Sequence, residues 1–345
     1  MADPTLLTVI LNYRTAEMTL KSLAAAHREM QDIDGEIVVV DNDSKDGSFA
    51  KITAAIRING WETDNRVRLV RTGHNGGFGA GNNFAIRAGL SGGQKPDFVF
   101  VLNSDAFPEK DAITHLLERL QSNPELGMAG SQILDPDTST HLTAFRFPSI
   151  WGELEGAART GPISRLLRDY VVAMPVPEAS QKVDWLAGAS LMIRQEMLDH
   201  IGLFDETFFL YFEETDLCLR AKRAGWLTYY QKESHVTHVG GVSTGMRNWQ
   251  RVPEYWLDSR HYYFTKNHGV AYAAVATIAH LIGGSLWWLR RRLQGKPHID
   301  PPRFLTDLMR HSWAKVKSDF KRRKPNASGT KTTESNPGKP ARRQT

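Results

Sequence analysis

The first third of the chain alternates between short apolar runs and longer amphipathic stretches. The apolar runs at residues 6–11, 36–40, 67–70 and 98–102 are rich in β-branched or aromatic side chains, which predicts strands. The amphipathic stretches at residues 17–30, 47–58, 82–90 and 111–121 predict helices that follow these strands. Strands that alternate with helices favour βαβ units, so we expect an α/β fold with a mostly parallel central sheet flanked by helices.

The pattern becomes irregular beyond residue 131, although several later stretches still predict regular structure. Residues 184–194 predict a strand bent at small side chains, residues 195–201 a short helix, and residues 216–224 a helix that ends at Gly225. Residues 270–289 hold a single side chain that can carry charge, His280, and three arginines follow at once. This stretch is long enough to span a bilayer, but its glycines, and two tryptophans beside the arginines, also suit an interfacial helix or an ordinary core helix.

Composition and charge change this picture mainly at the C-terminal end. With 345 residues, 41% of them apolar, the chain can bury a large core, which excludes full disorder. Residues 290–345 contain 16 Lys or Arg and four Asp or Glu, whereas the whole chain has a net charge of +5, so the preceding part is net acidic. A basic end of this kind suggests either an anionic partner or a solvated tail; of the anionic partners we expect a membrane surface and no nucleic acid.

The cysteine content and the composition of the two chain ends bear on the cellular compartment and on disorder. Cys218 is the only cysteine, so no intramolecular disulfide is possible and a cytoplasmic location is the default expectation. The N-terminal residues lack a basic region and a cleavage site, so we expect no signal peptide. Residues 321–345 have almost no apolar content, which predicts a disordered basic tail.

Polar side chains follow the first two predicted strands at the points where these strands end. In an open α/β sheet, ligands bind beyond the carboxyl ends of the strands. Asn12 and Arg14 could hold a nucleotide base or ribose there, although an ordinary strand-to-loop junction would look the same. Asp41 could accept hydrogen bonds from a pyrimidine imide or a ribose hydroxyl, while Ser44 or Asp46 serves as a helix N-cap.

Two further segments suggest a site for a diphosphate. The glycine-rich run at residues 75–83 allows the backbone to approach a ribose or diphosphate closely, and Asn82 stands where a dinucleotide fingerprint needs glycine, which disfavours a nicotinamide cofactor. Asn103 and Asp105 follow the fourth strand. Asp105 is a natural ligand for Mg²⁺ or Mn²⁺, whereas Asn103 would reach the cation indirectly or not at all, and a simple turn is the alternative interpretation.

Carboxylates and histidines in the second half of the chain complete the candidate chemistry. Glu213, Glu214 and Asp216 lie directly after an aromatic run, where partial burial would raise a carboxyl pKa and suit a general base; acids in the first turn of a helix are the alternative. His235 or, more favourably, His238 could ligate the same cation, and the glycines and Ser243 that follow predict a loop over the phosphates.

The order and spacing of these segments resemble the family 2 glycosyltransferases of the GT-A fold, in particular their rhamnosyltransferase-like subgroup, over roughly residues 6–269. The resemblance implies transfer of a sugar from a nucleotide-diphosphate donor, often dTDP-rhamnose, with inversion. It also implies that Asp41 contacts the base, that Asn75 and Gly76 lie in the donor loop, and that Asp105 binds the cation.

The resemblance also implies catalytic roles, with one departure from the family pattern. The family usually has Glu-Asp where this chain has Glu213 and Glu214, so Glu214 takes the position of the general base. Because an extra methylene displaces the carboxylate by about a bond length, Glu213 remains an alternative base. The acceptor side would be shaped by Trp185, Asp216, Arg220, the segment around Gly188 and the insertion at residues 145–177.

Taken together, these patterns predict a GT-A domain at residues 1–269, a helical segment at 270–320 that could associate with a membrane, and the tail at 321–345. We expect a metal-dependent, inverting transferase that moves a sugar from dTDP or UDP to a saccharide or polyprenyl-linked acceptor at the inner face of the membrane, with no particular oligomeric state predicted. One alternative is a sugar nucleotidyltransferase, although the expected glycine-rich basic motif near the first strand is missing. The other is a non-catalytic sugar-nucleotide-binding subunit, which Asn103 and Glu214 motivate, and turnover of a nucleotide sugar discriminates them.

Overall fold

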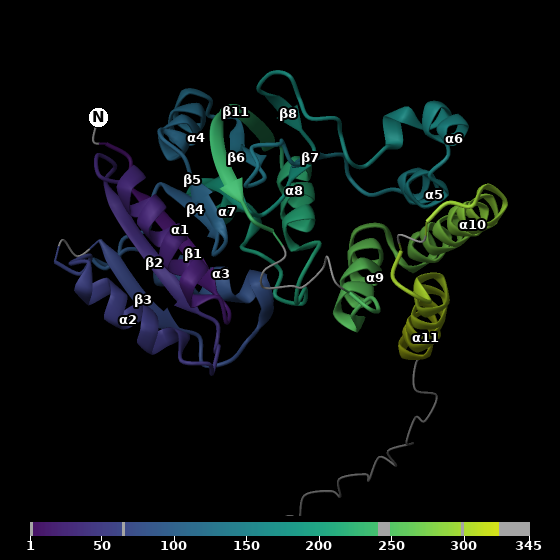
Figure 1. The fold of residues 1–345 in the computed structure, drawn as a ribbon, viewed down its shortest axis with the longest axis horizontal. Coiled ribbons are helices and arrows are strands. Elements are labelled where there is room, and N and C mark those ends of the chain that lie inside the picture. Colours follow the sequence, from purple (N-terminus) through teal and green to yellow (C-terminus); the bar gives the residue numbers. More distant parts are fainter. Residues whose placement is uncertain (1–2, 64–65, 241–248, 298–299, 324–345) are drawn as a thin grey trace, which may run out of the picture.

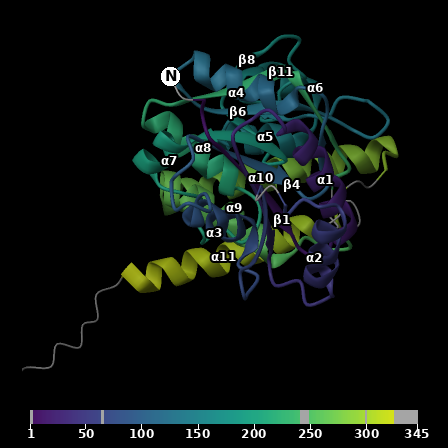
Figure 2. The ribbon, with the colours of Figure 1, turned by 90° about the vertical axis from the view of Figure 1, so that its left-hand side faces the viewer.

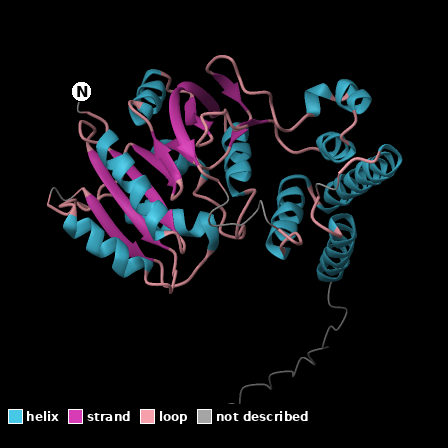
Figure 3. Ribbon diagram, in the orientation of Figure 1, coloured by secondary structure: helices cyan, strands magenta, loops and turns pink. Residues whose placement is uncertain are grey.

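The computed structural model describes residues 3–63, 66–240, 249–297 and 300–323, with side chains up to residue 318. A central sheet carries helices on both faces, and a group of C-terminal helices lies beside it (Figures 1 and 3). The predicted α/β fold is therefore confirmed. The predicted loop with Ser243 and most of the predicted disordered tail lie outside the described residues.

The first half of the sheet is parallel, as the sequence predicts. Its four strands pair in the order β3–β2–β1–β4, with bounds β1 Leu6–Asn12, β2 Gly35–Asp41, β3 Val67–Arg71 and β4 Phe98–Asn103. Neighbouring residues of a strand point to opposite faces, so Leu6 and Ile10 of β1 join one core cluster while Leu7 and Val9 join the other. Burial on both faces explains why these strands read as continuous apolar runs.

The second half makes the whole sheet mixed. An antiparallel strand, β10 (Ser190–Arg194), lies between β4 and β6 (Leu126–Leu134), and β11 (Leu227–His238) runs parallel to β6 and antiparallel to β5 (Ala106–Pro108) and β8 (Gln181–Val183). The predicted strand at 184–194 is divided, because its first part forms β9 (Trp185–Leu186) and pairs with β7 (Ala144–Phe145) in a separate small sheet.

The strands β6 and β11 were not predicted because polar and small residues interrupt them. Their buried hydroxyls are satisfied across the sheet: Ser131 Oγ lies 2.7 Å from Ser190 Oγ and 2.7 Å from Ser234 Oγ. A hydrogen-bonded serine is tolerated in a buried strand, whereas it removes the apolar pattern from which a strand is recognised.

Three helices cover each face of the sheet. One face carries α1 (Ala16–Glu29), α2 (Ser48–Ile58) and α4 (Ala112–Ser122), and the other carries α3 (Gly77–Ala88), α7 (Gln195–Ile201) and α8 (Glu213–Arg223). Two of these helices begin earlier than predicted: α3 begins inside the glycine-rich run, and α8 begins at the carboxylate cluster.

The remaining helices form a bundle beside the sheet. Residues 145–177 contain α5 (Ile150–Ala158), α6 (Gly161–Leu166) and a 3-10 turn, Arg168–Tyr170; α9 (Glu254–His268), α10 (Val270–Gln294) and α11 (Phe304–Arg323) follow later (Figure 2). The helices α5, α9 and α11 all contact α10. The close packing of α5 on α10 requires glycine, because a β-carbon added to Gly283 would lie 2.5 Å from the Leu154 carbonyl oxygen. The domain boundary at residue 269 stays a prediction.

The helix predicted at 270–289 is confirmed as part of α10. By length and composition α10 is long and apolar enough to cross a membrane, with a mean hydropathy of 1.5 over its most apolar window, and 33% of that window is buried. No other helix among the described residues meets these criteria.

A buried ion-pair triad joins α5, α9 and α10. Glu153 Oε2 lies 2.9 Å from Arg260 Nη2 and 2.6 Å from His280 Nδ1, and the Arg260 side chain is 2% exposed. Burial by itself would raise the pKa of Glu153, but the positive charge of Arg260 and the hydrogen bond with His280 lower it to about 2. A buried charge that keeps its partners is tolerated, whereas loss of one partner leaves the other uncompensated.

We therefore expect Glu153→Gln to destabilise the folded chain by about 3 to 5 kcal/mol, measured as the free energy of unfolding in denaturant. The matched control is Glu17→Gln, which breaks an exposed pair with Lys51 and should change that free energy by less than about 1 kcal/mol. The pKa of Glu153 is lowered on folding, so its stabilising effect is present above pH 4.5 and is lost as the pH falls towards 2. Equal effects of the two substitutions would contradict a structural role for the triad.

Candidate active site

A cleft of about 530 Å³ opens at the carboxyl ends of β1 and β4, between the first turns of α3 and α8. This is the edge of the sheet at which ligands bind in open α/β folds. Six of the residues predicted from the sequence line it: Asn75, Asn103, Asp105, Glu213, Glu214 and His238. The cleft thus brings together a glycine-rich segment, an Asp–His pair and a pair of glutamates that are up to 163 positions apart in the chain, from Asn75 to His238.

The Asp–His pair is positioned by strand pairing. In the register of β11 and β5, His238 lies opposite Ala106, the residue after Asp105, and the amide of Val239 donates to the Asp105 carbonyl oxygen at 3.1 Å. As a result His238 Nε2 lies 3.2 Å from Asp105 Oδ1. Asn103 Nδ2 lies 3.5 Å from the same imidazole nitrogen.

These side chains fit a divalent cation. A carboxylate oxygen and an imidazole nitrogen converge on one point of the cleft wall, and Mg²⁺ and Mn²⁺ accept such donors together with phosphate oxygens and water. The predicted ligands Asp105 and His238 are thus adjacent, and the Asn103 amide stands beside them rather than between them. The chemistry of the donor set, two protein ligands with room for a diphosphate, suits a cation that is shared with a substrate.

A second group of possible metal ligands lies on α9 and α11, away from this cleft. Ligand atoms of Glu254, Asp258 and His311 fall within 4.8 Å of one another. However, Lys315 Nζ lies 2.7 Å from Asp258, and His311 Nε2 lies 2.8 Å from it. The Lys315 ammonium already neutralises Asp258, so a salt-bridge cluster explains this group without a metal ion.

The two glutamates begin α8 and are presented by a strained turn. The two preceding residues, Tyr211 and Phe212, have φ angles of 71° and 70°, which L-residues rarely adopt. Such backbone strain is typical of sites where a side chain must be aimed against local preference. The turn places Glu213 and Glu214 at the cleft, so these residues both begin a helix, as one interpretation predicted, and line the cleft, while their catalytic role stays a prediction.

Burial sets the protonation behaviour of the two glutamates. The Oε2 atoms of Glu213 and Glu214 have no hydrogen-bond partner among the described residues. Burial, reinforced by the negative charge of Glu214, raises the pKa of Glu213 well above its ordinary range, and burial also raises the pKa of Glu214. Glu213 is 2% exposed, whereas Glu214 is partly exposed, so Glu214 is the more accessible proton acceptor.

The small residues before β10 form the wall opposite Glu214. Ala187, Gly188 and Ala189 line the cleft, and a β-carbon added to Gly188 would lie 3.9 Å from Glu214 Oε1 and 3.3 Å from the Phe78 ring. Any larger side chain here would enter the space in front of the glutamate. The predicted contribution of the segment around Gly188 therefore agrees with its position.

The glycine-rich segment is fixed from two sides. Asn42 Nδ2 donates to Asn75 Oδ1 at 2.9 Å and to the Gly77 carbonyl oxygen at 3.1 Å, and the Gly77 amide donates to Asn75 Oδ1 at 3.0 Å. Gly77 has φ +90°, and an added β-carbon would lie 1.9 Å from the Phe209 carbonyl oxygen. The glycine is thus required by the close approach of α3 to the 209 loop. Gly76 caps α3 and does not line the cleft.

Three predicted donor-binding residues lie outside the cleft lining: Asn12 and Asp41 are buried, whereas Arg14 is exposed. Asp41 is 2% exposed and accepts hydrogen bonds from Asn12 Nδ2 at 2.8 Å and from Ser44, while Arg14 Nε donates to the Ser44 carbonyl oxygen at 3.1 Å. None of the three lines the cleft. Their chain neighbours do: Leu11, Tyr13 and Asn42 line it. The alternation of side chains at a strand end is the sequence signal that could have identified these neighbours.

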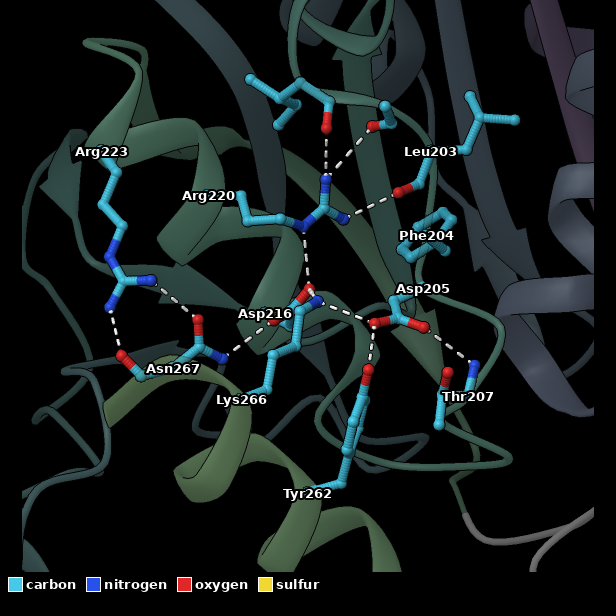
Figure 4. A network of polar contacts seen from close by, with 12 residues as sticks. Leu203, Phe204, Asp205, Thr207, Asp216, Arg220, Arg223, Tyr262, Lys266 and Asn267 are labelled. Carbon is cyan, nitrogen blue, oxygen red and sulfur yellow. Dashed lines mark hydrogen bonds and ion pairs between the residues drawn. The ribbon is translucent and has the colours of Figure 1, made fainter. Parts of the chain in front are cut away.

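The structure does not bring Asp216 and Arg220 to the cleft. Asp216 is fully buried and accepts hydrogen bonds from Arg220 Nε at 2.8 Å, Lys266 Nζ at 2.7 Å and Asn267 Nδ2 at 2.9 Å (Figure 4). Arg220 also donates to backbone carbonyl oxygens of residues 201–203. Every strong hydrogen-bonding group of this pair is used within the protein, so the pair holds α8 in place instead of contacting an acceptor.

Trp185 and the insertion likewise lie outside the cleft. Trp185 Nε1 donates to the Arg146 carbonyl oxygen at 2.9 Å, and its ring stacks on Phe145 with centroids 4.2 Å apart. No described residue of 145–177 lines the cleft, because that region forms α5, which packs on α10, and α6, which contacts α5.

An aromatic wall was missed by the sequence analysis. Phe209, Tyr211 and Tyr255 line the cleft, with the Phe209 and Tyr255 rings 5.6 Å apart and the Tyr211 and Tyr255 rings stacked at 6.4 Å. The aromatic run before Glu213 is a visible signal for the first two. Tyr255 reaches the wall from α9, and nothing in its local sequence indicates this.

Comparison with known proteins identifies a family and several relatives of this chain. Residues 4–256 match the family model described as "Glycosyltransferase like family 2". The N-acetylglucosaminyl-diphospho-decaprenol L-rhamnosyltransferase of Mycobacterium tuberculosis is 33% identical over 221 residues, which cover 61% of this chain and 68% of that protein. The low-salt glycan biosynthesis hexosyltransferase Agl10 of Haloferax volcanii is 28% identical over 216 residues, covering 62% and 61% respectively.

A solved structure agrees at the level of the fold. The mannosyltransferase PcManGT from Pyrobaculum calidifontis, in complex with GDP-Man and Mn²⁺, superposes with a TM-score of 0.51 at 14% identity and covers 92% of this chain and 88% of its own. At this identity the likeness shows the fold alone, which is the GT-A fold. The family match spans well over half of the chain, so the protein belongs to glycosyltransferase family 2 and is a GT-A glycosyltransferase.

Proposed function

We propose that this glycosyltransferase transfers rhamnose from dTDP-rhamnose, with inversion, to a hydroxyl of a saccharide or polyprenyl-linked acceptor in cell-surface polysaccharide synthesis. The observation that carries the proposal is one cleft that holds both an Asp105–His238 pair and a buried glutamate pair with unpartnered oxygens. The choice of sugar and of acceptor is supported by the relative that is named as a decaprenol-linked rhamnosyltransferase.

Glu214 acts as the general base in this proposal. The acceptor oxygen attacks the anomeric carbon, the bond between that carbon and the diphosphate oxygen breaks, and the nucleoside diphosphate leaves with the electron pair. Glu214 takes the proton from the attacking hydroxyl, for which a carboxylate with a raised pKa is suited. A single displacement from the face opposite the leaving group inverts the anomeric centre.

Glu213 keeps a supporting role. Its carboxyl is almost fully buried, and burial together with the negative charge of Glu214 raises its pKa well above the ordinary range, so Glu213 holds its proton to a higher pH than an exposed glutamate does. The geometry of Glu214, one methylene longer than the aspartate usual in the family, is accommodated by the small wall at residues 187–189.

The donor is bound at the opposite part of the cleft. Asp105 and His238 would hold a Mg²⁺ or Mn²⁺ ion, which, when bound, neutralises the diphosphate charge as it leaves. Asn42, Asn75 and Tyr13 lie near the nucleoside end. Asp41 acts from behind this wall, because its hydrogen bonds with Asn12 and Ser44 fix the ends of the first two strands.

The proposed acceptor also implies where in the cell the enzyme acts. A polyprenyl-linked acceptor would place the enzyme at the inner face of the membrane, which agrees with the basic C-terminal end. The nucleotidyltransferase alternative is set aside, because the chain belongs to a family of glycosyltransferases.

The decisive experiment is release of nucleoside diphosphate from dTDP-rhamnose and a panel of UDP-sugars, with a saccharide or lipid-linked acceptor present. We expect dTDP-rhamnose to be the best donor. Glu214→Gln should lower kcat by about 10²- to 10⁴-fold, because the base is removed while the size of the side chain is kept. The matched variant Glu213→Gln should lower kcat by less than about tenfold, since burial favours the neutral form of that carboxyl and Gln keeps its size without a charge.

If Glu213→Gln lowered kcat more than Glu214→Gln does, the base would be assigned to Glu213. Preference for a UDP-sugar would reject the donor and leave the base assignment standing. Donor binding without release by the unaltered enzyme, with every acceptor tested, would reject catalysis by this cleft.

The pH dependence provides a separate test. Glu214 must be ionised to accept a proton, and burial raises its pKa, so activity should be lost as the pH falls through a value above 4.5, the ordinary value. Circular dichroism over the same range separates this loss from unfolding, because Glu153 titrates only below pH 4.5. An acidic limb at or below pH 4.5 would exclude Glu214 as the base.

Metal dependence tests the Asp–His pair. We expect EDTA to abolish release and Mn²⁺ or Mg²⁺ to restore it. His238→Gln should raise the Mn²⁺ concentration for half-maximal activity by about tenfold or more, because one of two protein ligands is lost. The control is His235→Gln, which changes a histidine of the same strand that does not line the cleft. Full activity in EDTA would contradict the assignment.

A further inference from the structure

A second cavity of about 420 Å³ lies between α5, α10 and the start of α11, and it shares no lining residue with the catalytic cleft. Its wall contains Arg159, Arg291 and Arg303, with Asp300 as the only acidic side chain among the described lining residues. Asp300 is already paired with Arg159, the two side chains meeting at 2.7 Å. The side chains of Arg291 and Arg303 make no hydrogen bond or ion pair with a described residue, so the cavity carries a net positive charge.

An unpartnered donor points to a ligand in this cavity. Trp287 lines it and is only 9% exposed, yet its Nε1 has no hydrogen-bond partner among the described residues. A buried indole N–H normally finds an acceptor, because an unsatisfied donor costs about 1 to 3 kcal/mol. The residues before and in the first turn of α11, from Pro301 to Thr306, also line the cavity, and backbone amides at a helix start favour an anion. A cavity with a net positive charge, an unpaired indole N–H in its wall and the amides of a helix start therefore suits an anionic oxygen acceptor.

An apolar groove adjoins the cavity on the same helix. Ile278, Ile282, Leu286 and Leu289 line an open groove that shares Ser285 with the cavity wall. These four side chains are between 44% and 54% exposed, and their spacing of three or four residues places them on one face of α10. A row of exposed large apolar side chains of this kind is typical of an interaction surface in contact with lipid or protein.

We propose that the cavity and the groove together bind an anionic lipid, with its phosphate group among Arg291, Arg303 and the Trp287 indole and its hydrocarbon chain along the exposed face of α10. The charge of the cavity favours a lipid over a second copy of this chain, because a dimer would bring like charges together. Trp288 and Leu293 are also exposed, and the Arg292 guanidinium lies over the Trp288 ring. Apolar and basic side chains thus lie next to each other here, as is typical of a protein surface at a membrane interface.

The helix α10 lies on the membrane in this arrangement and does not cross it. Its other face packs on α5 and α9, where the triad of Glu153, Arg260 and His280 is buried. A crossing helix would have to carry these charged neighbours into the hydrocarbon layer, which is costly. An in-plane helix leaves the triad above the lipid and immerses only the exposed row.

The test is flotation of the full-length protein with vesicles of phosphatidylcholine, with and without phosphatidic acid. We expect binding only when phosphatidic acid is present. The double variant Arg291→Gln with Arg303→Gln should lower the partition coefficient by about tenfold or more. The control, Arg28→Gln with Arg57→Gln, removes the same charge from exposed positions on α1 and α2 and should lower it less than about threefold. Ile282→Asn with Leu286→Asn, at exposed positions, should also reduce binding.

Several outcomes would overturn the proposal. Equal losses in the two arginine double variants would show unspecific charge attraction, to which the basic chain end contributes equally in both. Binding of inorganic phosphate without binding of vesicles would assign the cavity to a free anion. Self-association that Ile282→Asn with Leu286→Asn abolishes, without vesicle binding, would assign the groove to a second copy.

The proposal does not depend on the proposed donor or acceptor. Vesicle binding is measured without any sugar nucleotide, and release of nucleoside diphosphate from dTDP-rhamnose with a soluble saccharide acceptor should be unchanged in the Arg291 and Arg303 variant. Loss of release in that variant would connect the cavity to catalysis and contradict a purely lipid-binding role.

Discussion

The buried carboxylate of Asp216 is the interaction on which the active site depends. An ionised group without solvent is tolerated only when hydrogen bonds and opposite charges surround it, and Asp216 obtains these from Arg220 on its own helix and from Lys266 and Asn267 on α9. Arg220 in turn satisfies the carbonyl groups at the end of α7. The helix α8, and with it the glutamate pair at its start, is thus fixed relative to α9 and to the end of α7 by the buried Asp216 carboxylate and its partners.

A comparable dependence links the cation-binding side to the sheet. His238 meets Asp105 only because β11 extends past β6 and pairs with the short β5 that follows β4. Neither strand end would form a site alone. The proposed base and the proposed cation ligands therefore come from elements that the tertiary fold, and not the local sequence, brings to one edge of the sheet.

The sequence predicted what is encoded locally. Continuous apolar runs identified β1 to β4, and polar side chains at strand and helix ends marked Asp105 and the glutamate pair as candidates, because these signals depend on neighbours within a few residues. The prediction failed where pairing is distant: Asp216 resembled a site residue because a charged group beside the glutamates is expected to be functional, and its partners Lys266 and Asn267 lie 50 and 51 positions along the chain. The strands β6 and β11 stayed hidden because cross-strand serine contacts replaced apolar burial.

The close contact of Gly77 with Phe209 has a dynamic consequence. No atoms separate the first turn of α3 from the loop that leads into the glutamates, and the Phe78 amide donates to the same carbonyl oxygen at 3.0 Å. The glycine-rich segment at the start of α3 and the loop before the glutamates are therefore in direct contact, and neither can move far without displacing the other. A displacement of the first turn of α3 would therefore press directly on the loop that leads into Glu213 and Glu214.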